Sequence, residues 1–162
     1  MRIEAKLTEL GLVLPAEMRA PPGFRVAWRQ VRLIRNRAII AGHGPRLANG
    51  EFAGPGGKVG SDLTLEQGRG AARAAGLAVL GDLKREIGDL DRIVSWTRVF
   101  GLVNAAPGFV ALAAVIDGFT ELMVEVFGEE IALCPRTVGG MAELALNSPV
   151  ILEGEVEIAD AS

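Results

Sequence analysis

Residues 64–103, TLEQGRGAARAAGLAVLGDLKREIGDLDRIVSWTRVFGLV, predict a long helix followed directly by a strand. Helix-capping residues stand at Ser61 to Thr64, the body is rich in alanine, and Gly88 supplies the C-terminal stop. Glycines at Gly68, Gly70 and Gly76 would each weaken an isolated helix by about 1 kcal/mol, which indicates that the helix packs closely against a sheet. The strand is expected over DRIVSWTRVFGLV, residues 91–103.

The segments before this unit predict a helix, a hairpin and a loop. Residues 3–12 carry apolar side chains at helical spacing, so a short amphipathic helix should cover an edge of the domain and end before Pro15. The stretch FRVAWRQVRLIRNRAIIAG, residues 24–42, predicts a β-hairpin around Arg35 and Asn36. Residues 43–61 are dominated by glycine and proline and should form a long irregular connection.

The segments after it predict a second long helix, residues 109–128, and two short strands, residues 134–144 and 149–159, joined through the turn-prone residues 147–149. The order is then strand, strand, helix, strand, helix, strand, strand. This order predicts one α/β domain over residues 1–162, an α+β sandwich with a mixed sheet and both long helices on one face.

Composition excludes several classes of protein. Seventeen Lys and Arg against twenty Asp and Glu give a formal net charge of -3, so nucleic acid is not an expected partner. One cysteine, Cys134, and one histidine, His43, leave little for a metal site, and we expect none. The opening residues lack the apolar core of a signal peptide and no run is long enough to span a membrane, so a cytoplasmic protein is expected.

Two apparent motifs do not support chemistry. Residues 54–58, GPGGK, look like a phosphate loop, but Val59 follows Lys58 where such a loop needs Ser or Thr, so an ordinary glycine-rich loop is the better interpretation. A nucleophilic triad would have to use His43, and no Gly-x-Ser-x-Gly elbow accompanies it. His43 is more readily explained as a loop residue that bonds a backbone group.

Arg136 is the strongest candidate for a functional residue. It lies among apolar strand residues, where its guanidinium must find a structural carboxylate or await a carboxylate ligand, and the residues alone leave both possibilities open. Glu153 alternates with Glu155 and Glu157, so from the residues alone the three form one solvated strand face.

Three stretches together resemble the YjgF-like, or reactive intermediate deaminase (Rid), family, and the similarity spans nearly the whole chain. They are GKVGSDLTLEQGRGAARAAGLAVL, GDLDRIVSWTRVFGLVNAAPGF and VFGEEIALCPRTVGGMAELALNSPVILEGEVEI. The most specific part is an Arg followed by small and apolar residues, an Ala-x-Leu, a turn, and a strand that carries a Glu. In this chain these residues are Arg136, Ala142, Leu144 and Glu153.

The resemblance implies a chorismate-mutase-like fold assembled as a homotrimeric barrel, with clefts between subunits. It also implies cofactor-free hydrolysis of reactive enamines and imines of small carboxylates to a 2-keto acid and ammonia. Arg136 would then clamp the substrate carboxylate and Glu153 would position or activate water. The strand end at Gly42 would line the same cleft.

The chain departs from the common family pattern around this expected cleft. Phe24 stands near the position of a frequent Tyr, and Asp117 stands where an Asn is usual. Pro135 and Thr137 flank the arginine in place of Ala and Ser, next to Cys134, and His43 replaces a frequent Gln. Phe24, Asp117 and Cys134 are therefore expected, with Gly42, to shape substrate binding.

Three functions compete at this level. The first is a hydrolase acting as an imine or enamine deaminase, and the second is a non-catalytic trimeric protein that binds small carboxylates or metabolites. The third, a ribonuclease-like activity, is disfavoured by the acidic balance.

Overall fold

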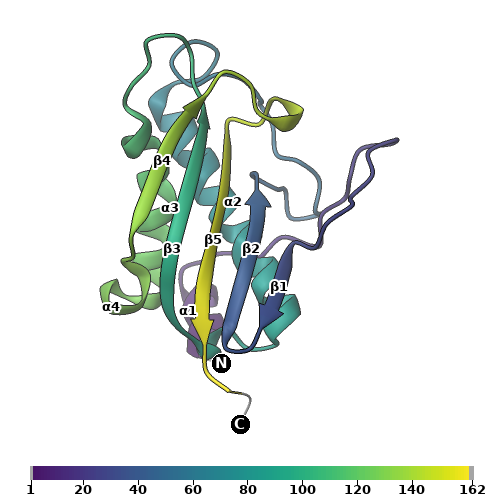
Figure 1. The fold of residues 1–162 in the computed structure, drawn as a ribbon, viewed down its shortest axis with the longest axis vertical. Helices are drawn as coiled ribbons and strands as arrows, with labels where there is room; N and C mark the ends of the chain where they lie inside the picture. The colour runs from purple at the N-terminus through teal and green to yellow at the C-terminus, as the bar shows by residue number, and fades with distance from the viewer. Residues whose placement is uncertain (1, 161–162) are drawn as a thin grey trace.

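The computed structural model describes residues 2–160 and contains one five-stranded sheet in the order β1-β2-β5-β3-β4. The strands are β1 (Val31–Ile34), β2 (Arg37–His43), β3 (Ile93–Asn104), β4 (Arg136–Met141) and β5 (Val150–Ile158). The pair β3 and β4 is parallel and the other neighbouring pairs are antiparallel. The sheet is therefore mixed, as predicted, and Figure 1 shows the long helices α2 (Leu65–Ile87) and α3 (Leu112–Phe127) together behind it.

The predicted helix over residues 64–88 is confirmed together with its caps. The Thr64 hydroxyl accepts a hydrogen bond from the Gln67 backbone N–H, and the Gln67 side chain accepts one from the Thr64 N–H, which forms a capping box. Gly88 ends the helix with φ of 81°. The second long helix begins at Leu112 rather than at residue 109, because Phe109 is held in a turn by its N–H bond to the Ala106 carbonyl.

The sequence predicts that the glycines of α2 allow close packing against the sheet, but in the structure Gly68 and Gly76 face α3. A Cβ on Gly76 would lie 2.9 Å from Leu122 Cδ2 of α3, and a Cβ on Gly68 would lie 3.1 Å from the Val59 methyl carbons and 3.2 Å from Val115 Cγ1 of α3. From the other side, a Cβ on Gly118 of α3 would lie 2.2 Å from the Arg69 carbonyl oxygen. The close approach is therefore between the two helices and not between helix and sheet, while Gly70 has nothing within 4 Å of its Cβ position.

The predicted hairpin is shorter than expected. Residues 24–30 form no strand, and β1 begins only at Val31. This stretch was expected to form the first strand of the hairpin, but Phe24, Val26 and Trp28 are all exposed and have no neighbouring strand to pair with. Phe24 and Trp28 instead stack edge to face on one another, with ring centroids 6.0 Å apart. The segment extends from the body of the molecule as an arm (Figure 1).

Smaller elements complete the domain: α1 (Arg2–Glu9), α4 (Glu129–Ala132) and the 3-10 turns η1 (Leu90–Arg92) and η2 (Ala145–Asn147). The predicted N-terminal helix is confirmed as α1, which ends at Glu9 and packs on α3 and η1. Within residues 2–160, no helix combines the length and the apolar character needed to cross a bilayer.

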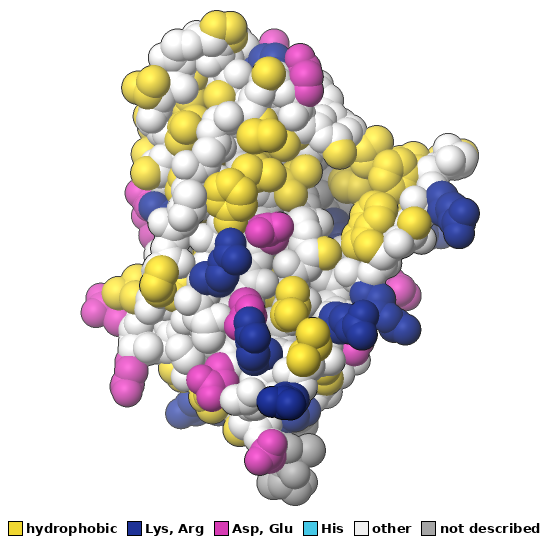
Figure 2. All heavy atoms as spheres, viewed as in Figure 1, with side chains coloured by type: hydrophobic (Ala, Val, Ile, Leu, Met, Phe, Trp, Pro, Cys, Tyr) yellow, Lys and Arg dark blue, Asp and Glu magenta, His cyan; other side chains and the backbone are white. Residues whose placement is uncertain are grey.

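The two faces of the sheet differ in character. In β5, Val150, Leu152 and Val156 are buried beneath the helices, while the alternate residues point to the other face. This second face carries no helix layer (Figure 1), and Figure 2 shows it with hydrophobic side chains gathered over its upper part and charged side chains below.

Candidate functional site

Arg136 opens β4 at the edge of the sheet and points toward α3. Its Nη1 donates to Asp117 Oδ1 at 2.9 Å and to Thr120 Oγ1 at 2.8 Å. Arg136 pairs with Val99 in the parallel register, so its side chain shares the helix-covered face with that buried valine. The guanidinium is largely buried, with 22% of the side chain exposed, and the carboxylate that it contacts is 43% exposed.

A cavity of about 230 Å³ adjoins this pair. Its lining includes Arg136, Asp117, Thr120 and Cys134 together with apolar residues of β3, α3 and α4. Burial raises the pKa of the Cys134 thiol, and the nearby Arg136 charge only partly opposes that effect. Cys134 is therefore a neutral wall of the cavity and not an activated nucleophile.

Glu153 lies on the opposite face of the sheet. Glu153 of β5 pairs with Phe100 of β3, whereas Arg136 of β4 pairs with Val99, the preceding residue of β3. Because successive residues of a strand point to opposite faces, the Glu153 and Arg136 side chains lie on opposite faces of the sheet. Its side chain is 47% exposed, and its nearest cationic partner is Arg98, with Nη2 3.9 Å from Oε1. Glu155 and Glu157 share this face, as expected, but accept hydrogen bonds from Arg37 and Asn36 respectively.

Gly42 and Phe24 both line a second, smaller cavity of about 80 Å³, on the face of the sheet that carries no helices. Ile151 also lines it, two residues before Glu153 on the same side of β5. Opposite Glu153, β2 contains an irregularity between Ile40 and His43, which places Ala41 and Gly42 out of the regular ladder. The predicted site residues thus fall into two groups. Arg136, Asp117 and Cys134 lie at the edge cavity, while Phe24, Gly42 and Glu153 lie on or beside the open face.

A buried polar cluster near Gly42 was not predicted. His43 Nε2 lies 2.9 Å from Asp82 Oδ2, and Arg46 Nη2 donates to the same oxygen at 2.6 Å. Arg85 donates to the other carboxylate oxygen from Nε at 3.1 Å and also from Nη2. Burial alone would raise the pKa of Asp82, but the hydrogen bonds from His43, Arg46 and Arg85 outweigh it and hold that pKa well below its usual range.

His43 has the backbone partner that the sequence predicts and, in addition, a side-chain partner that it does not. Its Nδ1 lies 2.6 Å from the Ala41 carbonyl oxygen, which is the expected backbone partner, whereas the contact with Asp82 lies 39 positions away in the sequence. The one available signal was the spacing of Asp82 and Arg85, which puts both side chains on one side of α2.

Lys58 of the glycine-rich loop is held by protein groups. Its Nζ donates to Asn104 Oδ1 at 3.0 Å and to the Ala142 carbonyl, which anchors the loop to β3 and to the residues after β4. This arrangement agrees with the interpretation of residues 54–58 as a structural loop.

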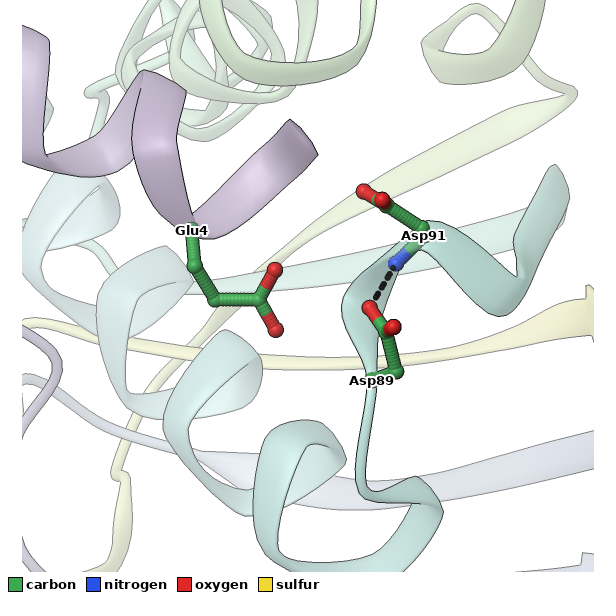
Figure 3. A group of neighbouring side chains, drawn as sticks. All are labelled: Glu4, Asp89 and Asp91. Carbon is green, nitrogen blue, oxygen red and sulfur yellow. Dashed lines mark hydrogen bonds between the residues drawn. The ribbon is translucent and has the colours of Figure 1, made fainter. Parts of the chain in front are cut away.

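One group of carboxylates lies close enough together to suggest a cation. Ligand atoms of Glu4, Asp89 and Asp91 lie within 4.8 Å of one another, and Figure 3 shows them between α1 and η1. Each has a structural partner: Asp91 accepts from the Arg2 and Ile3 N–H groups, Asp89 accepts from the Asp91 N–H, and Glu4 pairs with Lys84. These carboxylates therefore hold the first turn of α1 against η1.

Comparison with known proteins gives a consistent family match. The family model described as "YjgF/chorismate mutase-like, putative endoribonuclease" matches residues 4–153. Protein TCP17 of Trypanosoma cruzi is 31% identical over 157 residues, which are 97% of this chain and 94% of that protein.

Solved structures agree. The Agrobacterium tumefaciens protein Atu1372 is 30% identical with a TM-score of 0.84, over 97% of this chain and 94% of its own. A Shewanella oneidensis protein described as a "putative endoribonuclease" is 28% identical with a TM-score of 0.85, over 96% of this chain and 99% of its own. At the level of fold alone, E. coli TdcF with bound serine is 13% identical with a TM-score of 0.57, over 89% and 99%.

Proposed function

The chain belongs to the YjgF/chorismate mutase-like family, and on that premise we propose that it hydrolyses reactive imines or enamines of small carboxylates to a 2-keto acid and ammonia. The proposal includes a homotrimer with sites between subunits and a cytoplasmic location. The observation that carries it is the partly satisfied guanidinium of Arg136 in the edge cavity.

The geometry of Arg136 suits a carboxylate ligand. Only its Nη1 has hydrogen-bond partners within residues 2–160, so Nε and Nη2 are left to donate to a ligand. These two groups form the edge of the planar fork that binds a carboxylate with two parallel hydrogen bonds. The serine bound by TdcF, a protein of the same fold, is a small molecule with such a carboxylate.

The separation of Arg136 from Glu153 favours a site shared between copies of the chain. The two side chains lie on opposite faces of one sheet, so one chain cannot direct both at one small substrate. A second copy that packs its β4 edge against the open face would bring its own Arg136 toward Glu153 and Gly42. Closed cyclic assembly would also cover the apolar upper part of this face, which includes Phe100, Leu102 and Ile151.

The chemistry that we propose needs water and no cofactor. Glu153 orients a water molecule and accepts its proton as the oxygen attacks the imine carbon, while the imine nitrogen takes up a proton. The resulting carbinolamine expels ammonia as the carbonyl forms, so one imine and one water give one 2-keto acid and one ammonia. Arg136 holds the carboxylate throughout and fixes the position of the reacting carbon.

Ammonia release from 2-aminoacrylate generated in the assay tests the proposal. The unmodified protein should accelerate release, and Arg136→Ala should abolish the acceleration without a change in melting temperature. Arg73→Ala is the matched control, because Arg73 pairs with Glu125 on the exposed side of the helices and should leave the rate unchanged. Equal rates with and without the protein would exclude the proposed activity.

The contact with Asp117 supports one alternative, a non-catalytic binder of small carboxylates. Because Asp117 already neutralises part of the Arg136 charge, a ligand could bind in the edge cavity without being positioned for hydrolysis. Calorimetric binding of a 2-keto acid that depends on Arg136, without ammonia release from any imine tested, would favour this alternative.

A further inference from the structure

Charge is distributed unevenly along the chain and across the sheet. Residues 18–50 contain seven arginines and no Asp or Glu, whereas residues 99–135 contain five Asp and Glu and no Lys or Arg. The first segment includes the arm and β1, and the second includes α3 and α4. Since β1 and β4 are the two edges of the sheet and α4 comes shortly before β4, the domain has a basic side and an acidic side (Figure 1).

The charges at the outer ends of these two sides have no partner in their own chain. Within residues 2–160, Arg25 and Arg29 of the arm form no ion pair, and neither do the exposed Glu129 and Glu130 of α4. The other arginines of the basic side that form no ion pair are Arg19, Arg32 and Arg35. In Figure 2, Lys and Arg side chains gather on the side of the arm, and Asp and Glu side chains project beside α4. Two surfaces of opposite sign on one molecule attract each other between copies.

The arm also carries apolar side chains that its own chain leaves exposed. Phe24, Val26 and Trp28 are 37%, 38% and 45% exposed, and in the described part of the chain the backbone of residues 25–29 makes no hydrogen bond to another backbone group. An extended apolar and basic segment with so little support from its own domain is typical of a surface that packs on a partner. On the acidic side, Leu133 directly after α4 is 55% exposed and offers apolar surface beside carboxylates.

We propose that the arm of one copy of this chain docks on α4 of a second copy, with Arg25 and Arg29 beside Glu129 and Glu130 and the rings of the arm on Leu133. The inference rests on the assembly included in the proposed function, and it names the surfaces that hold the copies together. The contact joins opposite sides of two copies, so it is head to tail, and in a closed ring every copy uses each surface once.

The same contact covers the edge cavity of the second copy. Leu133 and Cys134 line that cavity together with Arg136, and Leu133 is the exposed part of this wall. An aromatic ring of the arm that packs on Leu133 therefore narrows the access of solvent to Arg136. The arm of one copy thus becomes part of the wall around the proposed substrate-binding arginine of the next.

Paired charge reversals test the contact between the two sides. Arg25→Glu with Arg29→Glu should weaken self-association at least about tenfold, and Glu129→Arg with Glu130→Arg should do the same, because like charges then face each other. All four substitutions in one chain restore opposite charges and should return the dissociation constant to within about threefold of that of the unmodified protein. Analytical ultracentrifugation over a range of concentrations measures these constants.

Glu51→Arg with Glu143→Arg is the matched control for charge and should leave association unchanged, because these exposed residues lie in the loops after β2 and β4. If the chain with all four substitutions associates no better than the chains with two, the charges do not meet and the contact is excluded. Unchanged association in both two-substitution variants would exclude it as well. Either result in a protein that still assembles leaves the proposed hydrolysis open, since no imine is used, and absence of ammonia release leaves the contact standing.

Thiol labelling of Cys134 tests whether the docked arm covers the cavity. Cys134 is the only cysteine of the chain and lines the edge cavity, so its rate of reaction with a bulky maleimide measures access to that cavity. Trp28→Ala should raise this rate several-fold at concentrations at which the copies remain associated. Val110→Ala, which removes another exposed apolar side chain, should leave it unchanged. Equal labelling rates in Trp28→Ala and in the unmodified protein would show that the arm does not cover the cavity.

Discussion

Asp117 Oδ1 accepts a hydrogen bond from Arg136 Nη1 at 2.9 Å, so the arginine proposed to bind substrate is already paired with a carboxylate of its own chain. Both residues are partly exposed, and the pair lies at the wall of the edge cavity. A substrate carboxylate at Arg136 must therefore share the guanidinium with Asp117. We therefore expect Asp117 to influence which ligands the cavity accepts.

Asp117→Asn should raise kcat/KM for 2-aminoacrylate-type imines by about tenfold. Two carboxylates several Å apart repel by roughly 1–3 kcal/mol at the effective dielectric of a partly buried site, and about 1.4 kcal/mol is a factor of ten. Steady-state kinetics measure the change. Glu121→Gln, which removes a charge from the same helix beside Arg69, is the control and should have no such effect. No change, or a fall, in Asp117→Asn would show that repulsion does not set substrate choice.

Arg136→Lys should recover little of the activity lost in Arg136→Ala. An ammonium group keeps the charge but lacks the planar pair of N–H groups, so it cannot contact Asp117, Thr120 and a bidentate carboxylate together. The measurement is kcat/KM on carboxylate-bearing imines, with melting temperature as a check on folding. Activity in the lysine variant near that of the unmodified protein would mean that charge alone is needed.

Glu153→Gln should lower kcat more than it changes KM, because the proposed role of Glu153 is toward water and not toward the substrate carboxylate. Since the Glu153 side chain is about half exposed, the melting temperature of the Glu153→Gln variant should barely change. Glu157→Gln on the same face of β5 is the matched control and should retain activity. A drop in melting temperature that matches the loss of activity would identify Glu153 as a structural residue.

Asp82→Asn should destabilise the fold by about 3 kcal/mol, because it leaves the buried Arg46 without its counter-charge. Denaturant unfolding at neutral pH measures this loss, and Glu86→Gln, an exposed change on the same helix, should have almost none.

The same carboxylate gives a pH dependence of defined sign. Since the pKa of Asp82 is lower in the folded protein than its unperturbed value of 3.8, its contribution to stability is full above about pH 4 and is lost as pH falls toward the folded value. Between pH 5 and pH 2, the free energy of unfolding should therefore fall more steeply in the unmodified protein than in Asp82→Asn. Parallel slopes would show that Asp82 does not dominate acid sensitivity.

Light scattering at micromolar concentration should give a particle of three times the 17.1 kDa chain mass. The number three comes from the family resemblance, while the placement of Arg136 and Glu153 on opposite faces calls for at least two copies at one site. A monomer would remove the inter-subunit site together with the proposed roles of Gly42 and Phe24.

The parts of the fold that local sequence determines were predictable. The helix over residues 64–88 carries its capping box and its terminal glycine in sequence, and the strand expected directly after it over residues 91–103 is found as Ile93–Asn104. The arm at residues 24–30 was expected to be extended as part of a hairpin but has no partner strand, and whether a partner exists depends on tertiary structure alone. The residues of the arm alone were thus not sufficient to predict whether it forms a strand.

The sequence allowed the residues of the candidate site to be selected, but not their arrangement in space. The face of the sheet on which Arg136 or Glu153 lies depends on the register of β4 and β5 against β3. A register shift of one residue would move either side chain to the other face. The pairing of Asp82 in α2 with His43 at the end of β2 and with Arg46 in the following loop spans more than thirty positions of sequence. No local pattern marks such a contact, because it arises only when α2 packs beneath β2.

The contact of Gly118 with the Arg69 carbonyl has a mechanical consequence for the residue beside it. With no room for even one methyl group between the helices, α3 cannot move closer to α2, and any rotation of α3 at this point would drive its backbone into that of its neighbour. Asp117 is thus carried on a rigid support. A ligand that needs more of the Arg136 fork must turn the Asp117 side chain to another rotamer, so the edge cavity adapts by torsion of one carboxylate and not by displacement of a helix.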